Sequence, residues 1–149
     1  MKLQQEFNIR VDLEQPLPVG PGPIGTRMYY DIIGGEISGE RVNGKVLGGG
    51  EWGLIGPDGY LRVDVRLQVE TDDGAFLYIQ YFGYLELNDA VMGAMQDQSD
   101  TSFEDQAFYT NPRVETGDER YSWLNHTFFI GRGRILSGGG VEYQVWRPA

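Results

Sequence analysis

The chain has 149 residues, enough for a substantial core, and we expect one domain over residues 1–149. Its formal net charge of −10 repels phosphate groups and anionic lipids, which argues against nucleic-acid and membrane partners. The absence of cysteine excludes disulfides, thiolate nucleophiles and cysteine-ligated metals. Because the first residues also lack a basic segment followed by an apolar run, we expect a cytoplasmic protein.

The N-terminal part alternates extended segments with turn signals. Strands are expected over Leu3–Leu13, Arg27–Ile37 and Glu40–Leu47. A loop rich in proline and glycine, Pro16–Gly25, separates the first two. The pair Asn43-Gly44 leaves a second interpretation of the third segment open, the tip of a hairpin. The glycines at 48–50 then bend the chain toward Glu51 and Trp52.

The central segment has the clearest strand pattern. Tyr60–Thr71 alternates apolar residues with charged or amide residues along its length. The turn Thr71–Gly74 joins it to a second strand, Ala75–Leu87. This second strand is apolar on both faces, so we expect both faces to be covered.

The C-terminal part contains the one helix that the sequence predicts, Asp89–Gln98. Asn88 or Asp89 can cap this helix, and Val91, Met92 and Met95 form an apolar stripe. Further extended segments are expected at Ala107–Thr110, Arg113–Thr116, Tyr121–Leu136 and Val141–Trp146.

Short strands with frequent turn signals are typical of an all-β sandwich or barrel. We favour an antiparallel up-and-down β-barrel of about eight to ten strands with one short helix, because closure removes exposed strand edges. A barrel of about eight strands can hold one small ligand.

Several segments together resemble the DUF3237 (UPF0311) family: Gly48–Trp52, Asp58-Gly59, Asp64–Arg66, Thr71–Ala75 and Tyr121–Asn125. The resemblance extends from about Arg27 to Val145 and implies a lipocalin-like or allene-oxide-cyclase-like β-barrel. The loop Pro16–Gly25 and the helix near Met92 have no counterpart in it. The family name assigns no activity, so the resemblance bears on the fold.

Asp64 and Arg66 share one face of the strand Tyr60–Thr71. If this face lines the barrel interior, Asp64 is a candidate catalytic base, and the neighbouring guanidinium keeps it ionised. The alternative is a ladder of charged residues facing solvent. The recurrence of Asp64 in the family motif raises its candidacy.

The most informative segment is Tyr121–Ile130. As a strand, it places Tyr121, Trp123 and Asn125 on one face, which suits a pocket with aromatic walls and a few polar groups. Asn125 is the second catalytic candidate, because its amide can orient a carbonyl. The ligand-binding candidates are Tyr29, Trp52, Arg66, Tyr121 and Trp123. The alternative is that the aromatics fill the core and that Asn125 satisfies backbone groups.

The remaining motifs give little information about function. His126, the single histidine, falls on the opposite strand face and is expected to pack or to lie at the surface. The match of Gly20–Gly25 to G-x-G-x-x-G precedes a strand pattern rather than a helix. One histidine, no cysteine and no calcium-loop spacing argue against a metal site, and no cofactor is expected.

The sequence therefore predicts a cofactor-free barrel that binds a hydrophobic, oxygenated small molecule. Isomerisation, cyclisation and hydration are the reaction classes considered, with Asp64 as base and with Asn125 and Tyr121 holding an oxygen. Two alternatives stay open: a carrier that performs no chemistry, and a structural homo-oligomer. A homodimer is compatible with all three.

Overall fold

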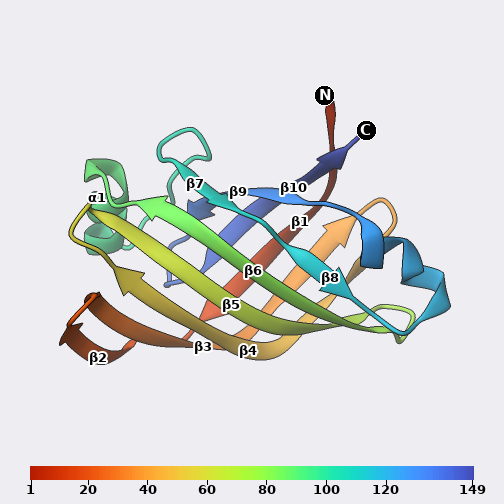
Figure 1. Ribbon diagram of the computed structural model, residues 1–149, viewed down its shortest axis with the longest axis horizontal. Coiled ribbons are helices and arrows are strands. Elements are labelled where there is room, and N and C mark those ends of the chain that lie inside the picture. Colours follow the sequence, from red (N-terminus) through yellow and green to blue (C-terminus); the bar gives the residue numbers. More distant parts are fainter.

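The computed structural model describes residues 1–149, and its strands wrap into a closed antiparallel barrel (Figure 1). Eight strand positions form the wall, and two further strands and one short α-helix are added to it. The elements in chain order are β1 (Leu3–Leu13), β2 (Leu17–Gly22), β3 (Gly25–Gly39), β4 (Asn43–Ile55), β5 (Tyr60–Thr71), β6 (Phe76–Glu86), α1 (Asp89–Asp97), β7 (Phe108–Thr110), β8 (Arg113–Glu115), the 3₁₀ helix η1 (Glu119–His126), β9 (Ile130–Ile135) and β10 (Val141–Pro148).

β1 closes the barrel, because it pairs with β10 on one side and with β3 on the other. From β3 to β6 each strand pairs with the next one along the chain, and β7 and β8 both pair with β6. β9 then connects β7 to β10. β2 pairs only with β3 and lies outside the closed wall. The predicted β-barrel fold is confirmed.

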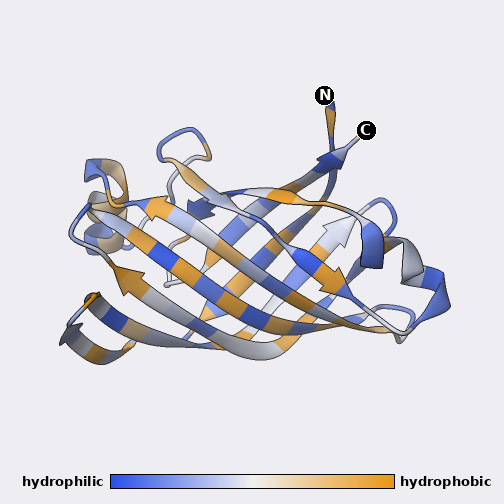
Figure 2. Ribbon diagram, viewed as in Figure 1, coloured by the Kyte–Doolittle hydropathy of each residue, from blue (hydrophilic) through white to orange (hydrophobic).

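The interior is filled by the apolar residues of each alternation, which Figure 2 shows as bands along the strands. In β5 the inward residues are Leu61, Val63, Val65, Leu67 and Val69, and all five are buried. This strand has the bounds that its sequence pattern predicts. Its outward residues alternate with them and are partly or fully exposed.

The prediction of one strand over Tyr121–Leu136 is wrong, because its first part forms η1 and only Ile130–Ile135 forms β9. Local hydrogen bonds favour the helix: the Asp118 carboxylate accepts from the Arg120 amide at 2.9 Å and caps η1. Tyr121 and Leu124, three residues apart, are the two buried side chains of η1. A spacing of three puts side chains on one side of a 3₁₀ helix, so they pack together although a strand would have separated them.

Three further expectations need correction. The loop Pro16–Gly25 contains β2, whose prolines are tolerated because this strand is at the edge of the sheet. Asn43-Gly44 begins β4, so it neither interrupts a strand nor forms a hairpin tip. The outer face of β6 is not covered, because Phe82 and Tyr84 are exposed there.

The helix α1 starts as predicted, with the Asn88 side chain accepting a hydrogen bond from the Val91 amide at 3.0 Å. Its buried residues are Val91 and Ala94, whereas Met92 and Met95 of the predicted stripe are exposed to about half of their area. None of the helices is long and apolar enough to cross a membrane.

Candidate functional site

The barrel interior is hollow at the end that α1 covers. A cavity of about 350 Å³ lies there between strand ends, the helix and the hairpin that joins β9 to β10. Its walls are mainly apolar and include Leu61, Val63, Leu85, Phe108 and Val141. A separate void of about 10 Å³ lies beside Tyr81 and Tyr143. The size of the α1-end cavity lies at the small end of the range of about 300–1,000 Å³ for ligand pockets.

Glu51 of β4 is the ionisable group in this cavity that stands out. It is 4% exposed, and it lies opposite Tyr30 of β3 on one side and Val65 of β5 on the other. Val65 is an inward residue of β5, and residues directly opposite each other share a sheet face, so Glu51 also points inward. Loss of hydration in this buried position raises the pKa of Glu51 from 4.5 to about 7.

A β-bulge puts Glu51 on the inner face. Val46 pairs with Val69 and faces inward, but the register shifts by one residue between Val46 and Gly48. Because alternation has a period of two, the extra residue moves every later position of β4 to the other face. Glu51 therefore turns inward, and Trp52, which would otherwise face the interior, turns out and is 44% exposed.

Tyr30 is the nearest phenol in the cross-strand register and also lines the cavity. Its hydroxyl donates to the Met28 Sδ at 3.7 Å, and a thioether is a weak acceptor. Burial, and then the negative charge of Glu51, raise the pKa of Tyr30, which keeps the phenol protonated. Tyr30 is thus a hydrogen-bond donor beside a carboxyl that can gain or lose a proton.

Two more phenols lie deeper. Tyr81 and Tyr143 pack edge to face with ring centroids 5.2 Å apart, and neither hydroxyl has a hydrogen-bond partner of good geometry. Burial raises the pKa of both, so both remain neutral. They add two buried hydroxyls to the barrel interior.

The lining of the cavity contains no lysine, arginine or histidine. Its charged or chargeable groups are Glu14, Glu51 and the phenol of Tyr30. An anionic ligand would therefore find no cation to pair with, which disfavours carboxylates and phosphates.

The structure places part of the predicted site on the outer wall. Tyr29, Trp52 and Asp64 are successive partners across β3, β4 and β5, and the rings of Tyr29 and Trp52 pack at a tilt of 58° with centroids 5.0 Å apart. Asp64 does not line the interior, because its neighbours Val63 and Val65 are the inward residues. Arg66 follows on the same outer face and is exposed. Whether this outer row binds a ligand stays a prediction.

Tyr121, Trp123 and Asn125 form a separate group in η1, away from the row on β3–β5. The Tyr121 hydroxyl donates to both carboxylate oxygens of Asp73 at 2.8 and 2.9 Å, and the ring of Trp123 lies 3.6 Å beneath the Arg41 guanidinium. Asn125 accepts from the amide of Thr116 and donates to its carbonyl, so both ends of its side chain are engaged by backbone. These contacts are of the kind expected from the alternative interpretation, in which the aromatics pack and Asn125 satisfies backbone groups. A ligand role for the three residues stays a prediction.

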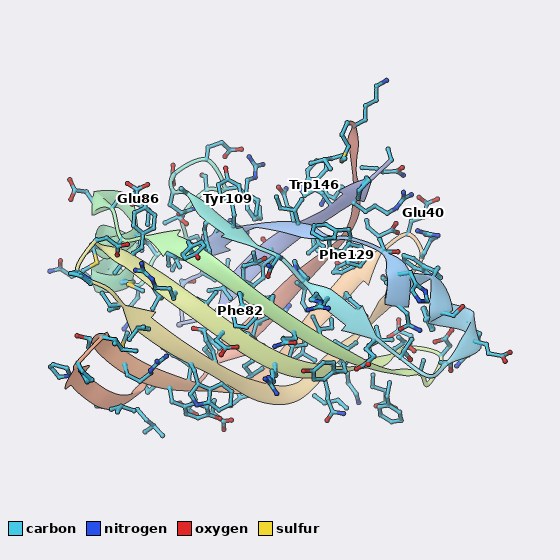
Figure 3. All side chains as sticks on the ribbon, in the orientation of Figure 1. Glu40, Phe82, Glu86, Tyr109, Phe129 and Trp146 are labelled. Carbon is cyan, nitrogen blue, oxygen red and sulfur yellow. The ribbon has the colours of Figure 1, made fainter.

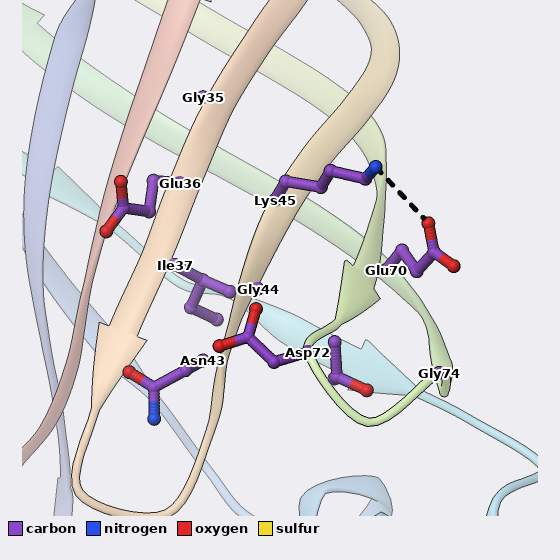
Figure 4. Close-up of a pocket in the computed structure, with 10 residues that line it drawn as sticks. Gly35, Glu36, Ile37, Asn43, Gly44, Lys45, Glu70, Asp72 and Gly74 are labelled. Atoms are coloured by element: carbon purple, nitrogen blue, oxygen red, sulfur yellow. Dashed lines mark ion pairs between the residues drawn. The ribbon is translucent and has the colours of Figure 1, made fainter.

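Two other hollows lie elsewhere. A polar groove of about 500 Å³ crosses the ends of β3, β4 and β5, where Lys45 Nζ lies 3.7 Å from Glu70 Oε1 (Figure 4). Ile37 is the only hydrophobic residue that lines it. A second groove of about 700 Å³ separates β8 from residues 125–129 and contains Asn125 and His126. Neither combines an apolar wall with a buried carboxyl, so the α1-end cavity is the best candidate site.

One feature of the sequence indicates that Glu51 faces inward, although the alternation alone does not predict it. Three glycines precede it, and glycines within a strand mark bulges. One extra residue at these glycines turns Glu51 toward the interior and Trp52 toward the outer wall.

These features define a small closed antiparallel β-barrel, hollow at one mouth, with an ionisable carboxyl in the hollow. The chain belongs to the DUF3237 family, described as proteins of unknown function, whose family model matches residues 1–148. The predicted family is thereby confirmed, and the match includes the two segments that the sequence resemblance left out.

Relatives have been found in several bacteria. A UPF0311 protein of Clostridium acetobutylicum is 32% identical over 91% of this chain and 87% of its own length. A UPF0311 protein of Rhodopseudomonas palustris is 36% identical over 84% of this chain and 82% of its own length.

Solved structures share the barrel. A conserved protein of unknown function from Rhodopseudomonas palustris has a TM-score of 0.87 at 27% identity and covers 98% of this chain and 96% of its own. A protein from Clostridium acetobutylicum has a TM-score of 0.85 at 27% identity, with coverage of 100% and 97%. An enzyme from Penicillium herquei has a TM-score of 0.72 at 21% identity, with coverage of 98% and 92%, and at that identity the likeness concerns the fold.

Proposed function

We propose that the protein binds an uncharged, hydrophobic, oxygenated small molecule in the α1-end cavity and that Glu51 exchanges a proton with it. The observation that carries this proposal is the Glu51 carboxyl, buried against an apolar cavity of about 350 Å³ with a pKa of about 7. A carboxyl with a pKa near the working pH can act as acid and as base.

The reaction classes that fit are isomerisation, cyclisation and hydration without a cofactor. Each of them moves protons between carbon and oxygen atoms and requires a group that both accepts and returns a proton. Glu51 takes in this proposal the role of base that the sequence suggested for Asp64. The alternative is a carrier that binds the same kind of molecule and leaves it unchanged.

The binding part of the proposal is tested with β-naphthol, a small neutral fluorescent alcohol. Ala94 of α1 is buried and lines the cavity, whereas Ala90 of the same helix is exposed. Ala94→Phe fills the cavity and should weaken β-naphthol binding at least about tenfold, a loss of about 1.4 kcal/mol. Ala90→Phe adds the same ring outside and should leave binding unchanged in a fluorescence titration. Equal affinities of the two variants would rule the cavity out as the binding site.

A homodimer is a separate proposal. Exposed aromatic side chains extend over the outer wall, among them Trp52, Phe82, Tyr84 and Tyr109, and Figure 3 marks Phe82 and Tyr109. Contiguous exposed apolar surface is typical of subunit contacts, which supports this face as the region to examine in a measurement of molecular mass in solution.

A further inference from the structure

We propose that Tyr30 and Glu51 form a proton-transfer pair for an uncharged ketone, with the Tyr30 hydroxyl binding the carbonyl oxygen and Glu51 moving a proton at the adjacent carbon. This inference rests on the proposed function and names the substrate class of the same cavity. It assigns to Tyr30 a role in contact with the substrate.

The pair is built by the sheet. Tyr30 and Glu51 are direct partners in the register between β3 and β4, and both line the cavity. Direct partners have Cβ atoms about 4.5–5.5 Å apart. A carbonyl oxygen and the α-carbon are separated by two bonds, so one ligand can meet both side chains at once.

Tyr30 is available as a donor. The one hydrogen bond of its hydroxyl is to the Met28 sulfur, at 3.7 Å, and a carbonyl oxygen is a better acceptor than a thioether. Binding a ketone therefore exchanges a weak hydrogen bond for a stronger one. Burial keeps the phenol protonated at neutral pH, so it donates rather than repels the developing oxygen charge.

The charge of the cavity selects a neutral ligand. No lysine, arginine or histidine lines it, while Glu14 and Glu51 do. A keto acid or a phosphorylated ketone would bring a second anion next to these carboxyls without a partner. A ketone with an apolar carbon skeleton matches both the polar pair and the hydrophobic wall.

The step balances without an oxidant or reductant. Ionised Glu51 takes a proton from the α-carbon, the C–H bond breaks, and its electron pair moves into the enolate, whose oxygen accepts the hydrogen bond from Tyr30. Protonated Glu51 then returns the proton to the same carbon or, in a conjugated enolate, to the γ-carbon. The product is the starting ketone or its isomer, and Glu51 is ionised again.

The test uses β-tetralone, a bicyclic ketone with acidic α-protons, in deuterium oxide. The carboxyl proton of protonated Glu51 exchanges with the deuterium oxide, so the α-carbon receives deuterium when the enolate is protonated. Nuclear magnetic resonance follows the resulting loss of the α-proton signal with the wild-type protein and with four variants. Glu51→Gln should slow the protein-dependent exchange by at least about 100-fold, because it removes the base. Tyr30→Phe should slow it by about 100-fold with little change in the β-tetralone dissociation constant, because the hydrogen bond strengthens as the enolate forms.

Matched control variants remove a carboxylate and a phenol hydroxyl from the outer surface of the protein. Glu40→Gln and Tyr84→Phe lie at exposed positions and should leave the exchange rate unchanged. With the wild-type protein, the exchange rate after subtraction of the buffer rate should rise with pH and level off above about 7, the pKa of Glu51, because the ionised carboxylate is the active form. This pH profile tests the inference even if Glu51→Gln does not fold, since a rate independent of pH between 5 and 9 (a range of about two units on each side of 7) contradicts it.

The outcomes separate the two proposals. If β-tetralone binds but exchanges no faster than in buffer, the ketone inference is overturned and the binding function survives. An exchange rate unaffected by Glu51→Gln also overturns the inference. If neither β-tetralone nor β-naphthol binds, both proposals fail.

Discussion

Glu51 shows how the surroundings of one residue change its acidity. A carboxylate in water is solvated on all sides. At 4% exposure the charged form of Glu51 loses that hydration, and no cation lines the cavity to compensate for the loss. The result is a carboxyl with a pKa of about 7, which shares its cavity with Tyr30. Perturbed pKa values of this kind cluster at functional sites.

The same burial predicts a dependence of stability on pH. Because the pKa of Glu51 is about 7 in the folded protein and 4.5 when unfolded, the folded state binds more protons between these values. Its stability therefore falls as pH rises from about 4.5 to about 7, by up to about 3 kcal/mol from this group. Glu51→Gln removes the titration, so its stability relative to wild type should increase by up to this amount between pH 4.5 and 8 in urea unfolding. Parallel curves for the two proteins would contradict the assigned pKa.

At the scale of the element, β4 is a strand whose two halves face differently. The bulge between Val46 and Gly48 reverses the alternation, and the backbone there approaches β5 closely. Gly49 has a φ of +152°, and a Cβ on it would overlap the carbonyl oxygen of Arg66. The strand therefore depends on glycine at this point to present Glu51 to the cavity.

Gly49→Ala should therefore destabilise the protein by at least about 2 kcal/mol, from backbone strain and overpacking. The control is Gly93→Ala in α1, where an added Cβ meets nothing within 4 Å. Alanine is a better helix former than glycine, so this variant should gain about 0.5–1 kcal/mol. Chemical denaturation of the two variants measures both changes, and a neutral Gly49→Ala would show that β4 does not need the close approach.

At the scale of the whole molecule, the two ends of the barrel differ. α1 covers the hollow end, whereas η1 adjoins an ionic cluster in which the buried Glu6 meets the partly exposed Arg41 and Arg147. Arg41 Nη2 and Arg147 Nε each lie 2.6 Å from Glu6 Oε1, and the Arg41 guanidinium stacks on Trp123 of η1. The cluster ties β1, the connection after β3, β10 and η1 together.

Glu6→Gln should cost about 2 kcal/mol at neutral pH, because the partly exposed guanidinium groups of Arg41 and Arg147 lose their charged hydrogen-bond partner. The hydrogen bond from Arg41 holds the pKa of Glu6 below its usual value, so the wild-type advantage is present at neutral pH and declines as the pH falls. Asp12→Asn removes an exposed pair with Arg10 and should cost less than about 1 kcal/mol. Urea unfolding at two pH values compares them, and equal costs would show that the Glu6 cluster is no stronger than a surface ion pair.

What the sequence by itself determined is local. The alternation over Tyr60–Thr71 predicts β5, and Asn88 predicts the start of α1, because both signals reside in neighbouring residues. The number of such segments and the turns between them predicted an all-β sandwich or barrel, and the barrel was favoured because closure removes exposed strand edges. The alternation over Tyr121–Leu136 wrongly predicts one strand. The capping of η1 by Asp118 and the hydrogen bonds of Asn125 to Thr116 outweigh this alternation.

What only the tertiary structure decided is which side chains meet. The pairing of β1 with both β10 and β3, the extra residue in β4 and the covering of one mouth by α1 all depend on contacts between segments far apart in the chain. A one-residue shift against β5 moved Glu51 into the cavity and Trp52 onto the outer wall. Facing depends on register, and register is set by the partner strand as well as by the strand's own residues.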